Sequence, residues 1–273
     1  MGLLSAIFSV SEVLGQNLEV MRTFVPRSLA SGDNEEALRT GLRVLYFSEP
    51  GERGMPAYWV GEAFSRLGEH AEAVQYFQFA AALLQEDSLV FECQMKWAKS
   101  YLELGKPEKA LWCLGKCEAN SAVERKRLGF YLGLVEYARK NDSAAVRHFS
   151  NCAESPFQAA KVRDIFGEMG RLKRKKPVVA TVLSYILPGA GQIYGGDVKN
   201  ALNSVLLTAA FTGLGIYVWT AVGVLEAGIL VAPWLFRYYR GGATRAGHNL
   251  RNRQAEKRDM LFRQMLEVLE GKW

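Results

Sequence analysis

The sequence predicts an all-α protein in two parts, a helical repeat array followed by a small transmembrane helical hairpin. Small residues recur in the first half at spacings of 35 to 37 residues, which is typical of stacked helix pairs. Residues 200–236 form an apolar run of 37 residues in which only Glu226 is charged. A glycine-rich stretch, residues 187–196, precedes that run. We therefore divide the chain into an N-terminal segment (1–16), a repeat domain (17–170), a basic linker (171–177), a membrane domain (178–242) and a basic amphipathic tail (243–273).

The first 16 residues allow two interpretations. Residues 3–10 are apolar and have the length of a short secretory signal, with Gly15 before Gln16 as a tolerable cleavage site. Against a signal, no Lys or Arg precedes this segment, and Glu12 interrupts the region. Residues 1–16 are therefore either a signal or an amphipathic helix that caps the repeats.

A Gly-x-x-x-x-Ala pattern indicates the repeat domain. It occurs three times, and a degenerate fourth copy has lysine in place of glycine: the copies are Gly32…Ala37, Gly68…Ala73, Gly105…Ala110 and Lys140…Ala145. The alanines lie 36, 37 and 35 residues apart, close to the tetratricopeptide period of about 34. This pattern resembles a tetratricopeptide array. The resemblance implies helix pairs over residues 16–47, 56–84, 88–119 and 123–154, and a closing helix over residues 157–169.

Small and large positions recur in phase with these alanines. Small residues stand twelve positions before three of them, where they let two paired helices approach closely, and large residues such as Phe77 and Phe149 stand four positions after. The expected packing residues are Gly61, Ala73, Ala98, Ala110, Gly133 and Ala145. The first repeat departs from the pattern, because Val25 and then Pro26 occupy the small position and Gly41 occupies the large one. We expect either an irregular first helix there or a capping repeat.

Charge is distributed unevenly along the chain. Residues 171–273 carry a net charge of +9, whereas residues 1–170 carry −3. The five cations of residues 171–176 directly precede an apolar segment, where they suit anionic lipid headgroups at about 1 kcal/mol each. Because the positive charge flanks apolar segments and no basic-aromatic stripe occurs, we expect a lipid bilayer with anionic headgroups as a partner, and no nucleic acid.

The cysteines and histidines do not form a recognisable metal site. Cys113 and Cys117 lie on one helix face, but no second ligand pair follows at zinc spacing, so we expect the four cysteines to be buried packing residues. His70, His148 and His248 lie far apart in the sequence. We predict no catalytic residue, no metal ligand and no cofactor.

The apolar run of residues 200–236 is nearly twice the ~20 residues that a helix needs to cross a bilayer. We interpret it as a hairpin whose turn falls between Gly213 and Gly223, near the interface-favouring Tyr217 and Trp219. We expect the returning helix to end at Gly241–Gly242. Glu226 is then either a polar contact within the membrane or a residue at the interface, if the turn lies late in that range.

The glycine-rich stretch resembles a family signature. Residues 184–196 contain Pro188-Gly189-Ala190-Gly191-Gln192-Ile193-Tyr194-Gly195-Gly196. This is similar to the Pro-Gly-x-Gly-Gln-x-Tyr-x-Gly signature of the TM2-like family of small two-helix membrane domains. Bacterial relatives carry such a domain after tetratricopeptide repeats, which is the order found here. The resemblance implies an architecture for residues 177–250 and a bacterial cytoplasmic membrane location, but no defined activity.

The residues of this membrane motif have expected structural roles. Pro188 stops a helix, while Gly189, Gly191 and Gly195 allow a turn that other residues cannot adopt. Backbone at membrane depth has to be hydrogen-bonded by protein or water, so we expect Gln192 and nearby asparagines to bond the freed amides. Tyr194 belongs to the same polar set.

The side of the membrane has two possible assignments. If the segment over residues 177–194 does not cross, both basic flanks lie on one side, and the positive-inside rule places them and the repeats in the cytoplasm. If it crosses, three spans allow periplasmic repeats, as relatives with export signals suggest.

We expect a non-enzymatic, membrane-anchored scaffold whose repeat surface binds a protein or peptide. The alternative is that the hairpin is the working part, as a factor for membrane-protein insertion or assembly or as a pathway for a small solute, with the repeats recruiting clients. An enzyme is disfavoured, because no nucleophile-base pair or metal set occurs.

Overall fold

A computed structural model of the chain describes residues 2–269, with side chains from Asn17 onward. Every regular element in that part is a helix, so the all-α prediction is confirmed for the described residues. The chain divides into two compact units, residues 1–159 and residues 160–272.

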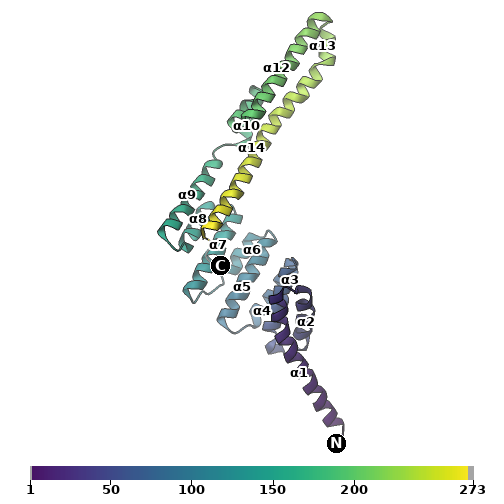
Figure 1. Cartoon of the computed structure of the whole chain (residues 1–273), viewed down its shortest axis with the longest axis vertical. Coiled ribbons are helices and arrows are strands. Elements are labelled where there is room, and N and C mark those ends of the chain that lie inside the picture. Colours follow the sequence, from purple (N-terminus) through teal and green to yellow (C-terminus); the bar gives the residue numbers. More distant parts are fainter. Residues whose placement is uncertain (1, 270–273) are drawn as a thin grey trace. The chain divides into compact units, whose positions relative to one another are not determined.

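The first unit is a series of consecutive helix pairs (Figure 1). Each helix contacts the next one, and α1 also contacts α3, α3 contacts α5, and α5 contacts α7. We call α1, α3, α5 and α7 the first helices, and α2, α4, α6 and α8 the second helices. Their bounds are α1 (Gly2–Ser31), α2 (Asn34–Phe47), the 3-10 helix η1 (Pro50–Glu52), α3 (Gly54–Arg66), α4 (His70–Leu83), α5 (Asp87–Glu103), α6 (Pro107–Leu114), α7 (Ala122–Ala138) and α8 (Asp142–Cys152). From α2 onward their bounds lie within two residues of those that the resemblance implies, except that α6 ends at Leu114, five residues before the expected end of the third pair.

Small residues on the first helices accommodate large residues on the second helices. A Cβ added at Gly61 would lie 2.9 Å from the ring of Phe77, and one added at Gly133 would lie 2.7 Å from the ring of Phe149. Any side chain at these two glycines would therefore collide with the ring. The four other predicted packing residues, Ala73, Ala98, Ala110 and Ala145, have no exposed surface.

The first repeat reverses this arrangement. Val25 is fully buried on α1, and a Cβ added at Gly41 of α2 would lie 3.8 Å from Val25 Cγ1 and 3.0 Å from Val60 Cγ2. The large residue thus stands on the first helix and the small residue on the second, so the space between the helices is still filled. Helix α1 continues through Pro26 without interruption, so the expectation of an irregular first helix is wrong.

The N-terminal segment joins the first repeat directly, because α1 runs from Gly2 to Ser31 as one helix. The side chains of residues 1–16 lie outside the described part of the structure. Both interpretations of this segment, signal and capping helix, therefore stay predictions.

The turn within each helix pair contains one residue in the left-handed backbone region. The φ angles are 84° at Gly32, 84° at Gly68 and 65° at Gly105, where glycine adopts them without steric cost. In the degenerate fourth copy Lys140 takes the same position with φ of 63°. A side chain there strains the backbone by about 1 kcal/mol.

The second unit contains α9 (Pro156–Leu172), whose first residues belong to the first unit, and the helices of the membrane domain. These are α10 (Pro177–Ile186), α11 (Ala190–Tyr194), α12 (Val198–Ala221), α13 (Val224–Leu230) and α14 (Ala232–Leu269). Helix α12 packs against both α13 and α14, so the chain reverses at Val222 and Gly223, at the late end of the predicted range (Figure 1).

The hairpin has unequal legs. Helix α12 is the one described helix that is long and apolar enough to cross a bilayer, so the prediction of two crossing helices is confirmed only in part. The returning leg is interrupted at Val231 between α13 and α14, and its apolar stretch ends before Arg237. Length and composition therefore support one candidate span and a shorter apolar return.

Helix α14 does not end at Gly241–Gly242, which corrects our expectation. It continues through both glycines to Leu269, so the predicted boundary between membrane domain and tail lies inside one helix. A glycine in a helix costs about 1 kcal/mol relative to alanine, and packing against α10, α11 and α12 can offset that cost. In the tail part, Leu261, Met265 and Leu269 repeat every fourth residue and are buried.

Candidate functional site

The membrane motif forms a tight double turn between α10 and α12. Gly189 has φ of 89°, and a Cβ added there would lie 2.9 Å from both Ala201 O and Val205 Cγ2 of α12. Gly196 also has a positive φ, 79°, just before α12 begins. Of the three glycines that we expected to allow a special turn, only Gly189 has this left-handed geometry; Gly195 has φ of −73°, which other residues adopt, so the expectation is wrong for Gly195.

Gly191 permits a closer approach than any other described glycine. A Cβ added there would lie 1.8 Å from Ala180 O and 2.4 Å from Ser184 Oγ, both on α10. The Gly191 amide instead donates a hydrogen bond to Ser184 Oγ at 3.0 Å. On α14, Gly247 approaches α10 similarly, because a Cβ added there would lie 2.1 Å from Thr181 Oγ1.

Gln192 is buried at the centre of the motif, with 4% of its surface exposed. Its Nε2 donates to Ser204 Oγ of α12 at 3.2 Å and to Gly242 O of α14 at 3.1 Å, while Ser184 Oγ of α10 donates to its Oε1 at 2.8 Å. One side chain thus joins three helices. Our expectation that Gln192 bonds amides freed at Pro188 is wrong, since Gly191 N bonds Ser184 and Gln192 bonds side chains and a carbonyl.

Two tyrosines add hydrogen bonds at the ends of α10. Tyr194 OH accepts a hydrogen bond from Lys176 N at 3.1 Å, at the start of the helix. Tyr239 OH of α14 donates to Tyr185 O at 2.6 Å, near its end. The motif, α10 and α14 are therefore connected at both ends of a short helix.

Asp197 is a functional candidate that sequence reasoning did not identify. It caps α12, accepting from Asn200 N at 3.4 Å and Asn200 Nδ2 at 2.7 Å, and it pairs with Arg253 Nη2 at 3.2 Å. Burial by itself raises the pKa of this carboxyl group, but hydrogen bonds from Asn200, the charge of Arg253 and a hydrogen bond from Asn249 outweigh it and lower the pKa. The sequence feature that could have identified Asp197 is its position just before the polar first turn of α12. The asparagine that we expected to bond freed amides thus bonds a carboxylate.

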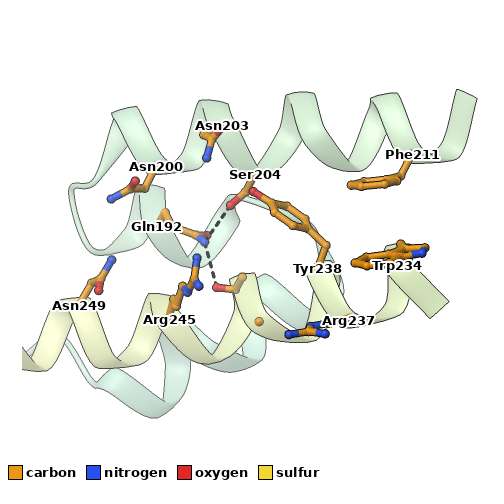
Figure 2. A pocket seen from close by; sticks show the side chains of 12 residues that line it. Gln192, Asn200, Asn203, Ser204, Phe211, Trp234, Arg237, Tyr238, Arg245 and Asn249 are labelled. Atoms are coloured by element: carbon orange, nitrogen blue, oxygen red, sulfur yellow. Dashed lines mark hydrogen bonds between the residues drawn. The ribbon is translucent and has the colours of Figure 1, made fainter. Parts of the chain in front are cut away.

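A pocket of about 540 Å³ opens beside this network, between α12 and α14 (Figure 2). Figure 2 shows side chains from both helices directed toward the space around Gln192. One part of the lining is polar or cationic and another part is aromatic. The lining residues are Gln192, Asn200, Asn203, Ser204, Phe211, Trp234, Arg237, Tyr238, Gly241, Gly242, Arg245 and Asn249. None of these described lining residues is acidic.

Glu226 lies at the tip of the hairpin, eight residues before the lining residue Trp234. It is exposed in the first turn of α13, three residues after Gly223, and a Cβ added at Gly223 would lie 2.4 Å from its Oε2. This arrangement favours the interface interpretation, because the turn falls at the late end of the predicted range. Glu226 does not line the pocket.

The cysteines and histidines are not brought together. His70, His148 and His248 lie on α4, α8 and α14, and no group of three or more potential metal ligands occurs among the described residues. The four thiols are buried or half-buried, and burial raises their pKa values. The pKa rises to about 12 for Cys93, Cys113 and Cys117 and to about 11 for Cys152. The thiols are therefore uncharged at neutral pH and poor nucleophiles.

The cationic and amide side chains of the pocket can hold an uncharged or anionic group. The described residues offer no nucleophile arranged beside a base. No protein-family model matches this chain, and no curated protein matches it.

Proposed function

We propose that this chain is a membrane-anchored, non-catalytic scaffold whose tetratricopeptide-like array binds a protein or peptide on the surface of its first helices. The observation that carries the proposal is the combination of one candidate membrane span with a unit of consecutive helix pairs in which the first helices lie next to one another. Such arrays present extended binding surfaces because each pair is rotated slightly relative to the last.

Ion pairs join neighbouring first helices. Lys96 Nζ of α5 lies 2.6 Å from Glu62 Oε2 of α3, and Arg127 Nη2 of α7 donates to Glu92 Oε2 of α5 at 3.0 Å. Arg66 Nε of α3 lies 2.7 Å from the other oxygen of Glu62. Each first helix from α3 to α7 is thus connected to the next by a charged pair.

The pair at Glu62 is charged at neutral pH. Burial by itself raises the pKa of Glu62, but hydrogen bonds and charges from Lys96 and Arg66 outweigh it and lower the pKa. Glu62 is 8% exposed, so solvent screens this pair less than a surface pair. The spacing of α3 and α5 is therefore set by a defined interaction, which supports a preorganised surface.

A photocrosslinking experiment tests the binding surface. Lys99 is exposed on the first helix α5, and Gln78 is exposed on the second helix α4, so a photoreactive amino acid at either site leaves the packing intact. We expect a discrete protein adduct from position 99 in cells and none from position 78. Equal adducts at both sites, or none at position 99, would contradict the proposal.

Membrane anchoring is tested separately by extraction. We expect the full-length protein to remain in the membrane pellet after carbonate and high-salt washing, because α12 is held by apolar burial rather than by charge. Release by salt alone would show that the protein is bound peripherally.

A second candidate function is favoured by the pocket between α12 and α14. A polar cavity beside a candidate span suits an insertion or assembly factor, or a pathway for a small solute, with the repeats recruiting clients. Under this candidate, substitutions lining the pocket reduce the amount of a client membrane protein or the passage of a solute, while crosslinking from position 99 still captures the client.

A further inference from the structure

The pocket between α12 and α14 contains two arginines without a partner. Arg237 and Arg245 both line it, and neither forms an ion pair or hydrogen bond with another part of the chain that the structure describes. They stand one helical turn before and one turn after Gly241, so they flank a position that has no side chain. Asn203, on the facing helix, likewise has no hydrogen-bond partner within the described residues.

Of the two cations, Arg237 lies at a depth where it needs an anion, if the hairpin is anchored as proposed above. Arg237 stands 14 residues beyond the turn at Gly223, which corresponds to about 21 Å along a helix. The bilayer core is about 30 Å thick, so Arg237 meets the lipid below the headgroup level when the hairpin tip reaches the far interface. A cation at that depth recruits a counter-ion or a polar path to the interface.

The remaining lining fits a molecule that is partly apolar. Phe211 and Trp234 lie at the end of the pocket toward the hairpin tip, and Tyr238 lies between them and Ser204, with its ring 6.0 Å from that of Phe211 (Figure 2). The two other asparagines, Asn200 and Asn249, bond Asp197 and so leave the arginines as the principal free donors. Guanidinium groups bind phosphate oxygens through two parallel hydrogen bonds.

We propose that this pocket binds the phosphate of an anionic phospholipid. Arg237, Arg245 and Asn203 donate hydrogen bonds to the phosphate oxygens, and the aromatic end packs against the glycerol and the first acyl carbons. The inference rests on the membrane anchoring proposed above for its choice of a lipid, but not for the pocket or its charge.

Lipid binding can be measured on the full-length protein in detergent, where anchoring plays no part. Native mass spectrometry with added phosphatidylglycerol gives the fraction of protein that carries lipid. We expect Arg237→Gln and Arg245→Gln each to weaken binding about tenfold, because each removes a charge-assisted contact. The matched control is Arg240→Gln: Arg240 is exposed on the same helix, as Arg237 and Arg245 are, but it does not line the pocket, and we expect a change below about twofold.

A second variant separates the pocket from general attraction between cations and lipid. A Cβ added at Gly241 meets nothing within 4 Å, and Gly241 lines the pocket between the arginines, so Gly241→Leu places a side chain there without altering the charge. We expect it to weaken phosphatidylglycerol binding as much as the loss of one arginine. Gly228→Leu, at a glycine of α13 that is equally open, is the control and should bind as the unmodified protein does.

The source of the phosphate is decided by competition. We expect neither inorganic phosphate nor glycerol 3-phosphate, at millimolar concentration, to displace the lipid, and we expect zwitterionic phosphatidylcholine to bind more weakly than phosphatidylglycerol. Displacement by either soluble phosphate would overturn the lipid assignment. Binding that survives both the arginine substitutions and Gly241→Leu would overturn the site itself. If these lipid-binding tests fail while the protein still resists carbonate extraction, the lipid site is refuted and the proposed membrane-anchored scaffold is not.

Discussion

At the scale of single residues, the glycines of the second unit differ sharply in what they permit. Gly191 stands where a Cβ would overlap Ala180 O at 1.8 Å, whereas a Cβ at Gly213 would meet nothing within 4 Å. Both are glycines in or beside apolar helices, and in the sequence they differ only in that Gly191 belongs to the membrane motif. The space around each glycine Cα determines whether a side chain is tolerated there.

We predict that Gly191→Val prevents assembly of the membrane domain and that Gly213→Val is tolerated. The first substitution forces a side chain into the backbone of α10, which costs more than about 3 kcal/mol because a backbone carbonyl cannot rotate away. The second places a side chain toward open space. Size-exclusion profiles in mild detergent would show aggregation for position 191 only. Equal behaviour of the two variants would contradict the close approach of α10 and α11.

We predict that Lys140→Gly stabilises the repeat unit. Lys140 is the non-glycine residue with positive φ in the described structure, and the three equivalent turns use glycine. Removing the strained side chain gains about 1 kcal/mol, less part of the entropy that a glycine adds to the unfolded chain. Thermal unfolding followed by circular dichroism should show a higher Tm. Gly105→Lys, which creates the same strain in the third repeat, should lower it.

At the scale of elements, the sequence predicts the repeat helices well and the membrane helices less completely. The paired helices are predicted because small and large residues recur in register, as at Gly61 with Phe77. The length of α14 was not predicted, because Gly241–Gly242 looks like a helix stop when its packing partners are unknown. Gln192 joins residues 8, 12 and 50 positions away. Partners so distant in the chain leave no local pattern.

The pocket was also outside the reach of sequence reasoning. Its two arginines follow the apolar run and stand in the sequence among the other basic residues that flank it. Only the pairing of α12 with α14 places Asn203 opposite Arg245 and Gly241. The sequence feature that could have indicated the pocket is a polar residue every three or four positions at the start of α12.

We predict that Ala110→Glu unfolds the third helix pair. Ala110 has no exposed surface, and it lies on α6, which contacts both α5 and α7. A carboxylate there is buried without a partner, which costs several kcal/mol. The melting temperature should fall by roughly 6–12 °C, the effect of about 3 kcal/mol in a domain of this size. Lys109→Glu, at the exposed neighbouring position, should leave it nearly unchanged.

At the scale of the whole molecule, the hairpin determines which segments share a side of the membrane. Helix α10 has 10 residues and ends at the motif, so it is about 15 Å long and too short to cross. If α12 and the returning leg both cross, the basic flanks lie on one side, and on the positive-inside rule we predict that this side is the cytoplasm.

We predict equal accessibility of the two basic flanks. In sealed vesicles, Arg174→Cys and Lys257→Cys should react with a membrane-impermeant thiol reagent either both or neither, because both positions lie on the same side of the hairpin. The unmodified chain gives the background, since its own thiols are buried or half-buried with raised pKa values. Labelling after detergent addition gives the total. Reaction of one position and protection of the other would indicate an odd number of crossings.

The continuity of α14 has a mechanical consequence. From Gly242, whose carbonyl binds Gln192, to Leu269 the helix runs 27 residues, about 40 Å, without an interruption in its hydrogen bonding. A tilt at one end of this helix therefore displaces its other end. A tilt of roughly 5° at the level of Gly242 displaces the Leu269 end by about 3.5 Å, which is close to the width of a methyl group. A small change of tilt beside the pocket therefore becomes a displacement of several ångströms at the Leu269 end of the helix.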